Sequence, residues 1–379
     1  MTDFVEYARS IALPNERAHR LMTLQYSYNG RGTGFLQKKR DVGRPVRVED
    51  VARVAGVSPI TVSRALSQPE KVREETRRRV AEAVAETGYV VNSFASMLRS
   101  GRSSIVTVFV SSLLNPHFAT AMQGLVDAFE GSRYHLMYAQ TGYSEMLGMD
   151  TVAAMLPFRP AGIAFTGIVR SEATRIALRQ LDLPVMEMWG DHDDPIDMLV
   201  GFSNVEGGRL MGQHFARRGF RHIAFCGHIG PRGTERLQGF RDGLGADAER
   251  LELIHPMEGN RGIPDGVAAL DAILSRLPDC DAIFFGSDIL AAGAILGALE
   301  RGIDIPGQVA VAGYGGLDFA PLLRPPLTTV SLEGYQMGLR AGRMLLARLE
   351  GGTVSQPVRI HPLHIDLRAS TGGGEATPP

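Results

Sequence analysis

The stretch VEDVARVAGVSPITVSRALS, residues 48–67, decides the fold of the first domain. In its first half, apolar residues recur at three- and four-residue steps, which predicts a short helix over 48–55. Gly56 then allows a sharp turn. Ser58 followed by Pro59 is a strong helix-start signal, because the hydroxyl can accept from free amides and proline fits the first helical position. A second helix is therefore expected to start at Pro59.

The second helix has an inner and an outer side. We expect Val62, Ala65 and Leu66 on the inner side, by their helical spacing. Five side chains then face solvent or a partner: Pro59, Ile60, Thr61, Ser63 and Arg64. A third helix is expected over 73–86, and Gly88 ends it. The three segments together predict a helix-turn-helix closed by a supporting helix.

Charge is unevenly distributed along the chain. Residues 37–102 carry fourteen Lys and Arg against eight acids, a net charge of +6, whereas residues 103–379 carry a net charge of −8. A basic head suits a polyanion, although short helical pairs also occur as plain structural hairpins. If the second helix enters a major groove, Arg64 is long enough to donate two hydrogen bonds to guanine.

Composition and motifs limit the function classes. The chain has 379 residues, 44% hydrophobic and 21% charged, with no run of apolar residues long enough for a membrane span and no secretory signal, so we expect a soluble cytoplasmic protein without a membrane partner. GxGxxG, GxxxxGK[ST], GxSxG and HExxH are missing from the sequence, so we expect no catalytic residue, cofactor or metal. Cys226 and Cys280 are expected to be buried free thiols.

The rest of the chain has an α/β pattern. From residue 105 onward, short β-rich runs alternate with helical stretches, which is typical of βαβ units and parallel sheets. There are enough strands for two sheets, and VGFSNVEGG, residues 200–208, lies where the chain would cross between them. We therefore expect two doubly wound lobes with a cleft between them, lined by loops at the carboxyl ends of strands.

The head resembles a known DNA-binding module. VEDVARVAGVSPITVSRAL and VREETRRRVAEAVAETGY are similar to the head of the lactose/galactose repressor (LacI/GalR) family, and Thr-Val-Ser-Arg at 61–64 is among its most specific signatures. RHIAFCG, TERLQGF, GSDILAAGA and VAVAGYGG resemble the effector domain of the same family. The resemblance covers about residues 45–370. It implies an α-helical helix-turn-helix head plus an α/β two-lobed periplasmic-binding-protein-like effector domain.

The patterns and the resemblance together predict a domain order and an assembly. The expected segments are a flexible extension over 1–44, a helix-turn-helix domain over 45–90, a hinge over 91–102, a two-lobed effector and dimerisation domain over 103–370, and a disordered tail over 371–379. The first lobe is expected to take about 103–201 and 333–352, and the second about 203–330 and 356–370. Two half-sites of a palindromic operator need two heads, so a homodimer is expected.

The resemblance assigns roles in the head and hinge. In the family, the residues that match Pro59, Ile60 and Arg64 contact bases. The residues that match Thr61 and Ser63 help to hold phosphates. The hinge VNSFASMLRSGR matches a segment that folds on DNA and inserts a leucine, here Leu98, into the minor groove; an ordinary linker is the alternative. The expected DNA-binding residues are Ser58, Pro59, Ile60, Thr61, Ser63, Arg64, Asn92, Ala95 and Leu98.

The resemblance also assigns an effector site. Arg236 matches a family arginine that reaches ligand hydroxyls or a carboxylate, and its fork of donors suits a carboxylate well. Asp288 starts a helix beside the cleft, so both a capping and a ligand role stay open. Phe118 fits the ligand edge and the core equally. The expected effector-binding residues are Asn115, Phe118, Tyr143, Trp189, Arg236, Ser287 and Asp288.

The segment GYGGLDF, residues 313–319, departs from the family pattern. Sugar-responsive members usually carry an aspartate just after the Gly-aromatic pair, and Gly315 stands there in this chain. Losing that acid while keeping Arg236 favours an anionic effector over a neutral sugar. The chain therefore looks most like the gluconate-utilisation repressors, which implies a repressor of carbohydrate catabolism controlled by gluconate or a related sugar acid. The alternatives are a metabolite-binding receptor with weak DNA binding and a regulator controlled by a protein partner.

Overall fold

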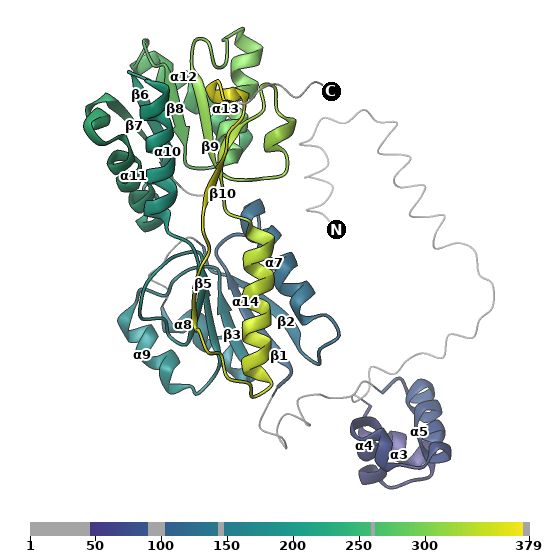
Figure 1. Cartoon of the computed structure of the whole chain (residues 1–379). Coiled ribbons are helices and arrows are strands. Elements are labelled where there is room, and N and C mark those ends of the chain that lie inside the picture. The colour runs from purple at the N-terminus through teal and green to yellow at the C-terminus, as the bar shows by residue number, and fades with distance from the viewer. Residues whose placement is uncertain (1–45, 90–102, 143–147, 259–261, 374–379) are drawn as a thin grey trace, which may run out of the picture. The chain divides into compact units, whose positions relative to one another are not determined.

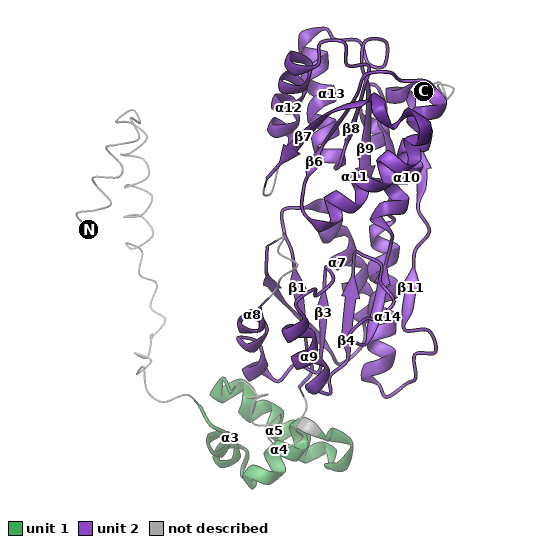
Figure 2. Ribbon diagram, turned by 90° about the vertical axis from the view of Figure 1, so that its left-hand side faces the viewer, with its two compact units in different colours: residues 1–92 green, residues 93–379 purple. Residues whose placement is uncertain are grey.

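The structure is a computed structural model that describes residues 46–89, 103–142, 148–258 and 262–373. The chain divides into two compact units, residues 1–92 and residues 93–379, drawn in two colours in Figure 2. The predicted extension over 1–44 and the hinge over 91–102 lie outside the described residues.

The first unit is a small helical bundle. Its elements are α3 (Val48–Ala55), α4 (Pro59–Ser67), the 3-10 turn η1 (Pro69–Lys71) and α5 (Glu74–Thr87). Its buried core consists of Val51, Ala52, Ala55, Val62, Ala65, Val80 and Ala83. Gly56 has a φ of +62°, in the left-handed region that favours glycine, so α3 ends at the predicted turn.

Local hydrogen bonds fix the turn between α3 and α4. The Ser58 hydroxyl accepts from the Thr61 backbone N–H at 3.2 Å, which caps α4 as the sequence predicts. Arg79 on α5 donates to the Ala55 carbonyl at 2.7 Å and so ties the third helix to the end of the first. The prediction that Leu66 faces the core is wrong: its side chain is 36% exposed, because one helical step turns it away from the small core.

The second unit contains two sheets (Figure 1). Among the described residues, the first has the order β11-β5-β4-β3-β1-β2 and the second the order β12-β10-β9-β8-β6-β7; all pairs are parallel except β10 with β12. The first sheet consists of β1 (Ile105–Val110), β2 (His135–Gln140), β3 (Gly162–Phe165), β4 (Val185–Met188), β5 (Met198–Gly201) and β11 (Val358–Ile360). The second consists of β6 (Ile223–His228), β7 (Leu251–Met257), β8 (Ala282–Phe285), β9 (Ala310–Gly315), β10 (Thr328–Ser331) and β12 (His364–Asp366).

Helices cover both sheets. The first lobe has α7 (Pro116–Phe129), α8 (Met149–Ala153), η2 (Leu156–Phe158), α9 (Glu172–Gln180) and α14 (Gly334–Leu349). The second lobe has α10 (Asn204–Arg218), α11 (Pro231–Leu244), η3 (Gly245–Arg250), α12 (Ile263–Arg276), α13 (Asp288–Arg301), η4 (Ala320–Leu322) and η5 (Ala369–Thr371). Helices pack in pairs, α7 along α14, α10 along α11 and α12 along α13. Central strands such as β1 and β9 are buried almost throughout, as expected for a parallel sheet covered on both faces.

Strand order locates the crevice of each lobe. In the first sheet β1 lies between β2 and β3, and in the second β6 lies between β7 and β8, so the winding direction reverses beside β1 and beside β6. Loops at the carboxyl ends of strands diverge at such a switch point and leave a crevice. The topology therefore places a crevice at the loops after β1 and β3 in the first lobe and at the loops after β6 and β8 in the second.

The return of the chain to the second lobe differs from the prediction. Residues 356–370 were all expected in the second lobe, but β11 pairs in parallel with β5 in the first sheet, with Val358 opposite Leu199. The last crossing therefore follows Ile360, and β12 alone joins the second sheet. β11 has only three residues, and Arg359 and Ile360 are exposed, so no apolar run in the sequence predicts a strand there. Its position in the first sheet is decided by backbone pairing with β5.

The ordered body also extends past the predicted boundary at residue 370. Ser370 donates to the Val311 carbonyl at 2.6 Å, and the Thr371 hydroxyl lies 2.9 Å from Nε2 of the buried His214. The prediction that the tail starts at residue 371 is therefore wrong, because these polar side chains complete hydrogen bonds of the second lobe. Residues 374–379 lie outside the described part.

The described residues also bear on the expectations about membrane spans, metal sites and cysteines. None of the described helices is long and apolar enough to cross a membrane. Within the described ranges, no group of three or more His, Cys, Asp or Glu side chains is placed to hold a metal ion. Cys226 and Cys280 are free and buried, which confirms that prediction, and burial raises the pKa of both thiols to about 12.

Candidate functional site

The head presents one side of α4 to its surroundings. The predicted base-contacting side chains are exposed, and Ile60 is 70% exposed, an unusual position for an isoleucine in a small bundle. The Ser58 and Thr61 hydroxyls lie 2.8 Å apart, so both also hold the start of the helix. Side chains exposed or half-buried along α4 and its cap are Ser58, Pro59, Ile60, Thr61, Ser63 and Arg64. The expected hinge contacts Asn92, Ala95 and Leu98 lie outside the described residues.

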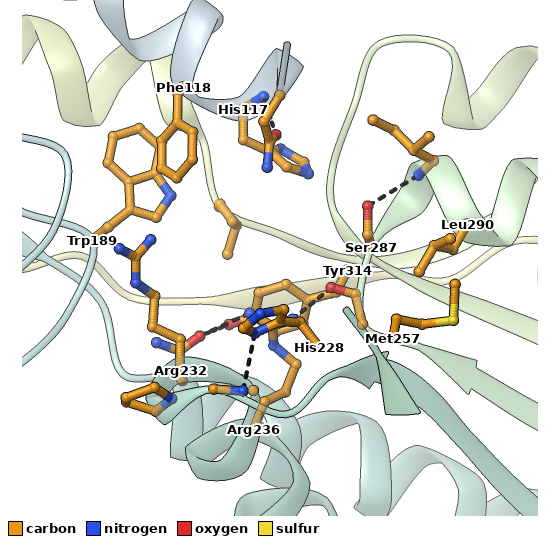
Figure 3. Close-up of a pocket in the computed structure, with 18 of the residues that line it drawn as sticks. His117, Phe118, Trp189, His228, Arg232, Arg236, Met257, Ser287, Leu290 and Tyr314 are labelled. Atoms are coloured by element: carbon orange, nitrogen blue, oxygen red, sulfur yellow. Dashed lines mark hydrogen bonds between the residues drawn. The ribbon is translucent and has the colours of Figure 1, made fainter. Parts of the chain in front are cut away.

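A cavity lies between the two lobes of the second unit, at the carboxyl ends of their strands (Figure 3). Its described lining includes two arginines, two histidines and two asparagines but no aspartate or glutamate. The lining residues are Asn115, His117, Phe118, Trp189, Phe202, Asn204, His228, Gly230, Pro231, Arg232, Gly233, Arg236, Met257, Gly286, Ser287, Ile289, Leu290, Tyr314 and Leu332. A cleft that combines cations with aromatic walls and lacks carboxylates is suited to an organic anion.

Arg236 is the central cation of the cleft. Its guanidinium lies 3.5 Å from the centroid of the Tyr314 ring, and it donates to the Gly286 carbonyl at 2.5 Å and to Asn204 Oδ1 at 2.9 Å. Its Nε is buried and has no hydrogen-bond partner among the described residues. Burial lowers the pKa of Arg236, with a smaller lowering from Arg232, but a guanidinium stays charged in proteins. The free Nε can therefore donate to a ligand.

Close helix packing sets the position of Arg236. A Cβ at Gly208 on α10 would collide with the Arg236 carbonyl on α11, and a Cβ at Gly239 would collide with the Val205 carbonyl. The two glycines thus let the helix backbones touch. This contact puts Asn204, the first residue of α10, beside the guanidinium.

Aromatic side chains form one wall of the cleft. The Trp189 ring meets the Phe118 ring edge-on with centroids 5.0 Å apart, and Figure 3 shows the two rings side by side. Arg232 of the second lobe lies with its guanidinium carbon 5.8 Å from the Phe118 ring centroid. Trp189 has a φ of +66°, which is rare for a bulky residue and is typical of functional sites.

A buried carboxylate supports the loop that carries Trp189. Glu187 is fully buried in β4, and its two oxygens accept from the backbone N–H groups of Val169 at 2.9 Å and Ile196 at 2.8 Å. Arg175 lies 3.6 Å from the same carboxylate and balances its charge. Glu187 therefore joins the loop after β3 to the loop after β4 and holds Trp189 at the cleft.

The structure contradicts the expectation that Asp288 faces the effector. Its carboxylate is fully buried and accepts from the Thr329 hydroxyl at 2.5 Å and from the Leu317 N–H at 2.8 Å, and it does not line the cleft. The capping role belongs to Ser287, whose hydroxyl accepts from the Ile289 N–H at 3.3 Å. Asp288 instead points away from the cleft and holds the turn after β9 in place.

The other expected effector residues are brought together as far as the structure describes them. Five of the seven line the same cavity: Asn115, Phe118, Trp189, Arg236 and Ser287. Tyr143 lies outside the described residues. Their contact with an effector stays a prediction.

Comparisons with known proteins agree with this geometry. Residues 47–92 match the model of bacterial regulatory proteins of the lacI family, and residues 213–371 match a periplasmic binding protein-like domain. The HTH-type transcriptional regulator GntR of Pseudomonas aeruginosa is 33% identical over 337 residues, which cover 88% of this chain and 97% of the relative. The chain belongs to the LacI family of bacterial regulatory proteins. It is a DNA-binding transcriptional regulator of that family.

Solved structures of LacI-family proteins confirm the predicted fold. A transcriptional regulator of this family from Silicibacter pomeroyi superposes with a TM-score of 0.81 at 32% identity, over 86% of this chain and 99% of the other. The transcription regulator GntR from Chromobacterium violaceum gives a TM-score of 0.65 at 31% identity, over 71% of this chain and all of the other. Further relatives are named IdnR, PurR and CelR, so family membership by itself does not choose the effector.

Six polar or aromatic residues of the LacI-family cleft were not predicted from the sequence: His117, Phe202, Asn204, His228, Arg232 and Tyr314. Four of them lie in segments that the sequence analysis singles out. His117 stands between the two predicted first-lobe residues, Phe202 and Asn204 lie in the crossing between lobes, and Tyr314 lies in the β9 run next to Gly315. His228 and Arg232 lie at and after the carboxyl end of β6, where cleft loops are expected, but no motif distinguishes them from their neighbours.

Proposed function

We propose that the chain represses genes of sugar-acid catabolism and that gluconate or a related sugar acid, bound in the cleft, controls its affinity for palindromic operator DNA. The observation that carries this proposal is the lining of the cleft around Arg236, which among the described residues holds two arginines and no aspartate or glutamate. Arg232 and Arg236 repel each other across the cleft, which contributes to the lowered pKa of Arg236. A carboxylate between them relieves that repulsion and accepts from both guanidinium groups.

The exposed side of α4 supports the DNA-binding half of the proposal. A helix entering a major groove reads bases through its N-terminal side chains, and α4 leaves its own first two residues exposed. Ile60 and Pro59 donate no hydrogen bond, so they would contact thymine methyl groups or read groove shape, and Arg64 would donate to guanine.

We also propose that the working form is a homodimer, since a palindrome needs two heads. Apolar side chains are exposed on the second unit at Leu113 and Leu114 in the loop before α7, and at Leu296 and Leu299 on α13. Leu114 is 79% exposed, and burying it at an interface between subunits would be favourable. Sedimentation of the full chain at micromolar concentration tests this, with a monomer as the contrary result.

Replacing Arg236 tests the effector class. Arg236→Ala is expected to weaken gluconate binding about 10- to 100-fold, because a hydrogen bond to a charged group contributes about 1.5–3 kcal/mol. Arg236→Lys keeps the charge but loses the fork of donors, so an intermediate loss is expected. Calorimetric titration with gluconate measures both variants, and their melting temperatures show whether the fold survives.

The same preparations separate the alternatives. A protein that binds gluconate but shifts no palindromic duplex would be the metabolite receptor. A protein that binds operator but neither gluconate nor a neutral sugar would be the partner-controlled regulator. Full gluconate affinity in a folded Arg236→Ala variant would contradict the proposed site.

A further inference from the structure

His117 belongs to the first lobe, but its side chain reaches the second. It follows the cap residue Asn115 at the start of α7, and its backbone N–H donates to Asn115 Oδ1 at 3.1 Å. Across the cleft, its ring lies against Gly315, the last residue of β9. Figure 3 shows the imidazole on one side of the cavity, facing the group formed by Arg236 and Tyr314.

His117 and Gly315 are sterically matched. A Cβ at position 315 would fall far inside van der Waals contact with the His117 ring. Gly315 also has a φ of +144°, which side-chain-bearing residues rarely adopt. No side chain can extend from the end of β9 into the cleft while the imidazole keeps this place. An acidic group is therefore excluded from a position close to the two arginines.

The imidazole is uncharged and incompletely bonded. Burial, and then the charge of Arg236, lower the pKa of His117 to about 4, so the ring is neutral near pH 7. Its Nε2 is buried and has no hydrogen-bond partner in the part of the chain that the structure describes. A neutral imidazole has one donor and one acceptor nitrogen, and a buried polar atom without a partner costs free energy until a ligand supplies one.

Two other cleft nitrogens share this condition, Asn204 Nδ2 and Arg236 Nε. Asn204 Oδ1 is already used by Arg236 and by the Tyr314 hydroxyl at 3.4 Å, so the Asn204 amide is left to donate. Two donors on one side suit carboxylate oxygens, and the neutral imidazole opposite suits a hydroxyl, which can both donate and accept. A hydroxy acid carries both kinds of group, a carboxylate and hydroxyls, whereas a neutral polyol offers no charge to Arg236.

We propose that His117 is the specificity-determining residue of this cleft: paired with Gly315, it excludes an acidic side chain from β9 and provides the hydrogen-bond partner for a hydroxyl of a bound hydroxy acid. This inference rests on the proposed function, since it names the residue that selects the anionic effector. Selectivity against neutral sugars then has two sources, attraction by Arg236 and the lack of a competing carboxylate, and His117 maintains the second.

The test compares gluconate with sorbitol, which has a neutral CH₂OH group in place of the carboxylate. Calorimetric titrations use the full chain at pH 7.5 and four variants. His117→Ala is expected to weaken gluconate binding about tenfold, and His117→Asn, which keeps a neutral polar group, less than that. His117→Ala/Gly315→Asp is expected to lower the ratio of gluconate affinity to sorbitol affinity at least tenfold more than His117→Ala does.

His255→Ala is the matched control. His255 also has a lowered pKa and a buried nitrogen without a partner among the described residues, but it does not line the cleft.

The outcomes distinguish this inference from the proposed function. If wild type binds gluconate well and His117→Ala binds it equally well, the inference is overturned while the anionic effector stands. If wild type binds sorbitol as tightly as gluconate, both are overturned. If the double variant fails to fold, the single variants decide, since they leave position 315 unchanged. A loss in His117→Ala that is smaller in His117→Asn and missing in His255→Ala supports the inference. A loss of equal size in His117→Asn or in the control His255→Ala overturns it.

Discussion

The buried carboxyl of Asp288 shows how one side chain can hold a cleft without touching its ligand. It accepts from Thr329 and Leu317 and so fixes the turn that follows β9, where Gly315 approaches His117 of the first lobe and Gly316 lies against Ser331 of β10. Burial raises the pKa of Asp288 to about 6, and its hydrogen bonds offset part of that rise. The group is therefore a structural acid whose ionisation costs stability.

Replacing Asp288 by asparagine tests this assignment. The folded pKa lies above the unfolded value of 3.8, so the native state binds a proton that the unfolded state releases between pH 3.8 and about 6. This contribution to stability is present below pH 3.8 and is lost as the pH rises through about 6. Asp288→Asn lacks the ionisation, so its free energy of unfolding relative to wild type is expected to increase from pH 4 to pH 7. Urea titrations at several pH values measure the difference, and a difference independent of pH would contradict the account.

Among the elements, α4 has the clearest functional assignment, and its start was predictable. Gly56, Ser58 and Pro59 act through local geometry, so their effect on the backbone can be read from sequence spacing. β11 was not predictable in the same way, because its pairing with β5 joins segments far apart in the chain. Local signals thus located the start of α4, whereas long-range pairing decided the third crossing between lobes.

The cleft residues also differ in whether local sequence or long-range contacts decide their position. Arg236 and Trp189 were found because a motif and a lone tryptophan in a polar loop single them out. The direction of Asp288 could not be found, since spacing places it beside the cleft but hydrogen bonds to β10 and to the turn after β9 turn it away. His117 was overlooked for a related reason: its environment depends on Gly315, almost two hundred residues further along the chain.

Removing the arginine of α4 tests its role in DNA recognition. Arg64→Ala is expected to weaken binding to a selected operator about 5- to 100-fold, since a base-contacting arginine contributes about 1–3 kcal/mol. Arg53→Ala is the matched control, because it removes the same charge from the exposed face of α3, where Arg53 pairs with Asp50 at 2.9 Å. Fluorescence anisotropy at fixed salt measures both. Equal losses in the two variants would reduce Arg64 to a general electrostatic role.

At the scale of the whole molecule, contacts between the lobes connect the cleft to the arrangement of the effector domain. Arg170, in the loop after β3, lies 2.7 Å from Glu235 on α11, the residue next to Arg236. The loop after β3 is also held through Glu187, which supports the Trp189 wall. An effector that pulls Arg236 and Trp189 together would therefore favour the arrangement in which Arg170 and Glu235 meet.

Charge reversal tests this link. Arg170→Glu and Glu235→Arg each replace an attraction between the lobes by a repulsion, and the double variant restores the pair. Each single variant is expected to weaken gluconate binding about 2- to 10-fold, because partly exposed ion pairs contribute about 0.2–1 kcal/mol and reversal adds repulsion. The double variant is expected to recover most of the loss in calorimetric titrations. Losses that add up without recovery would show that the pair does not act in closure.

The central claim is that one chain reads DNA through α4 and changes its affinity for DNA when an organic anion binds beside Arg232 and Arg236 in the cleft. The most direct measurement is the dissociation constant of the full chain for a duplex selected from a random library, taken at fixed salt without ligand, with saturating gluconate and with sorbitol. The account predicts that selection yields a palindrome and that gluconate changes the constant about 5- to 150-fold, the range of about 1–3 kcal/mol typical of allosteric coupling, while sorbitol leaves it unchanged. A selection that yields no palindrome, or a constant that is the same in all three conditions, would contradict it.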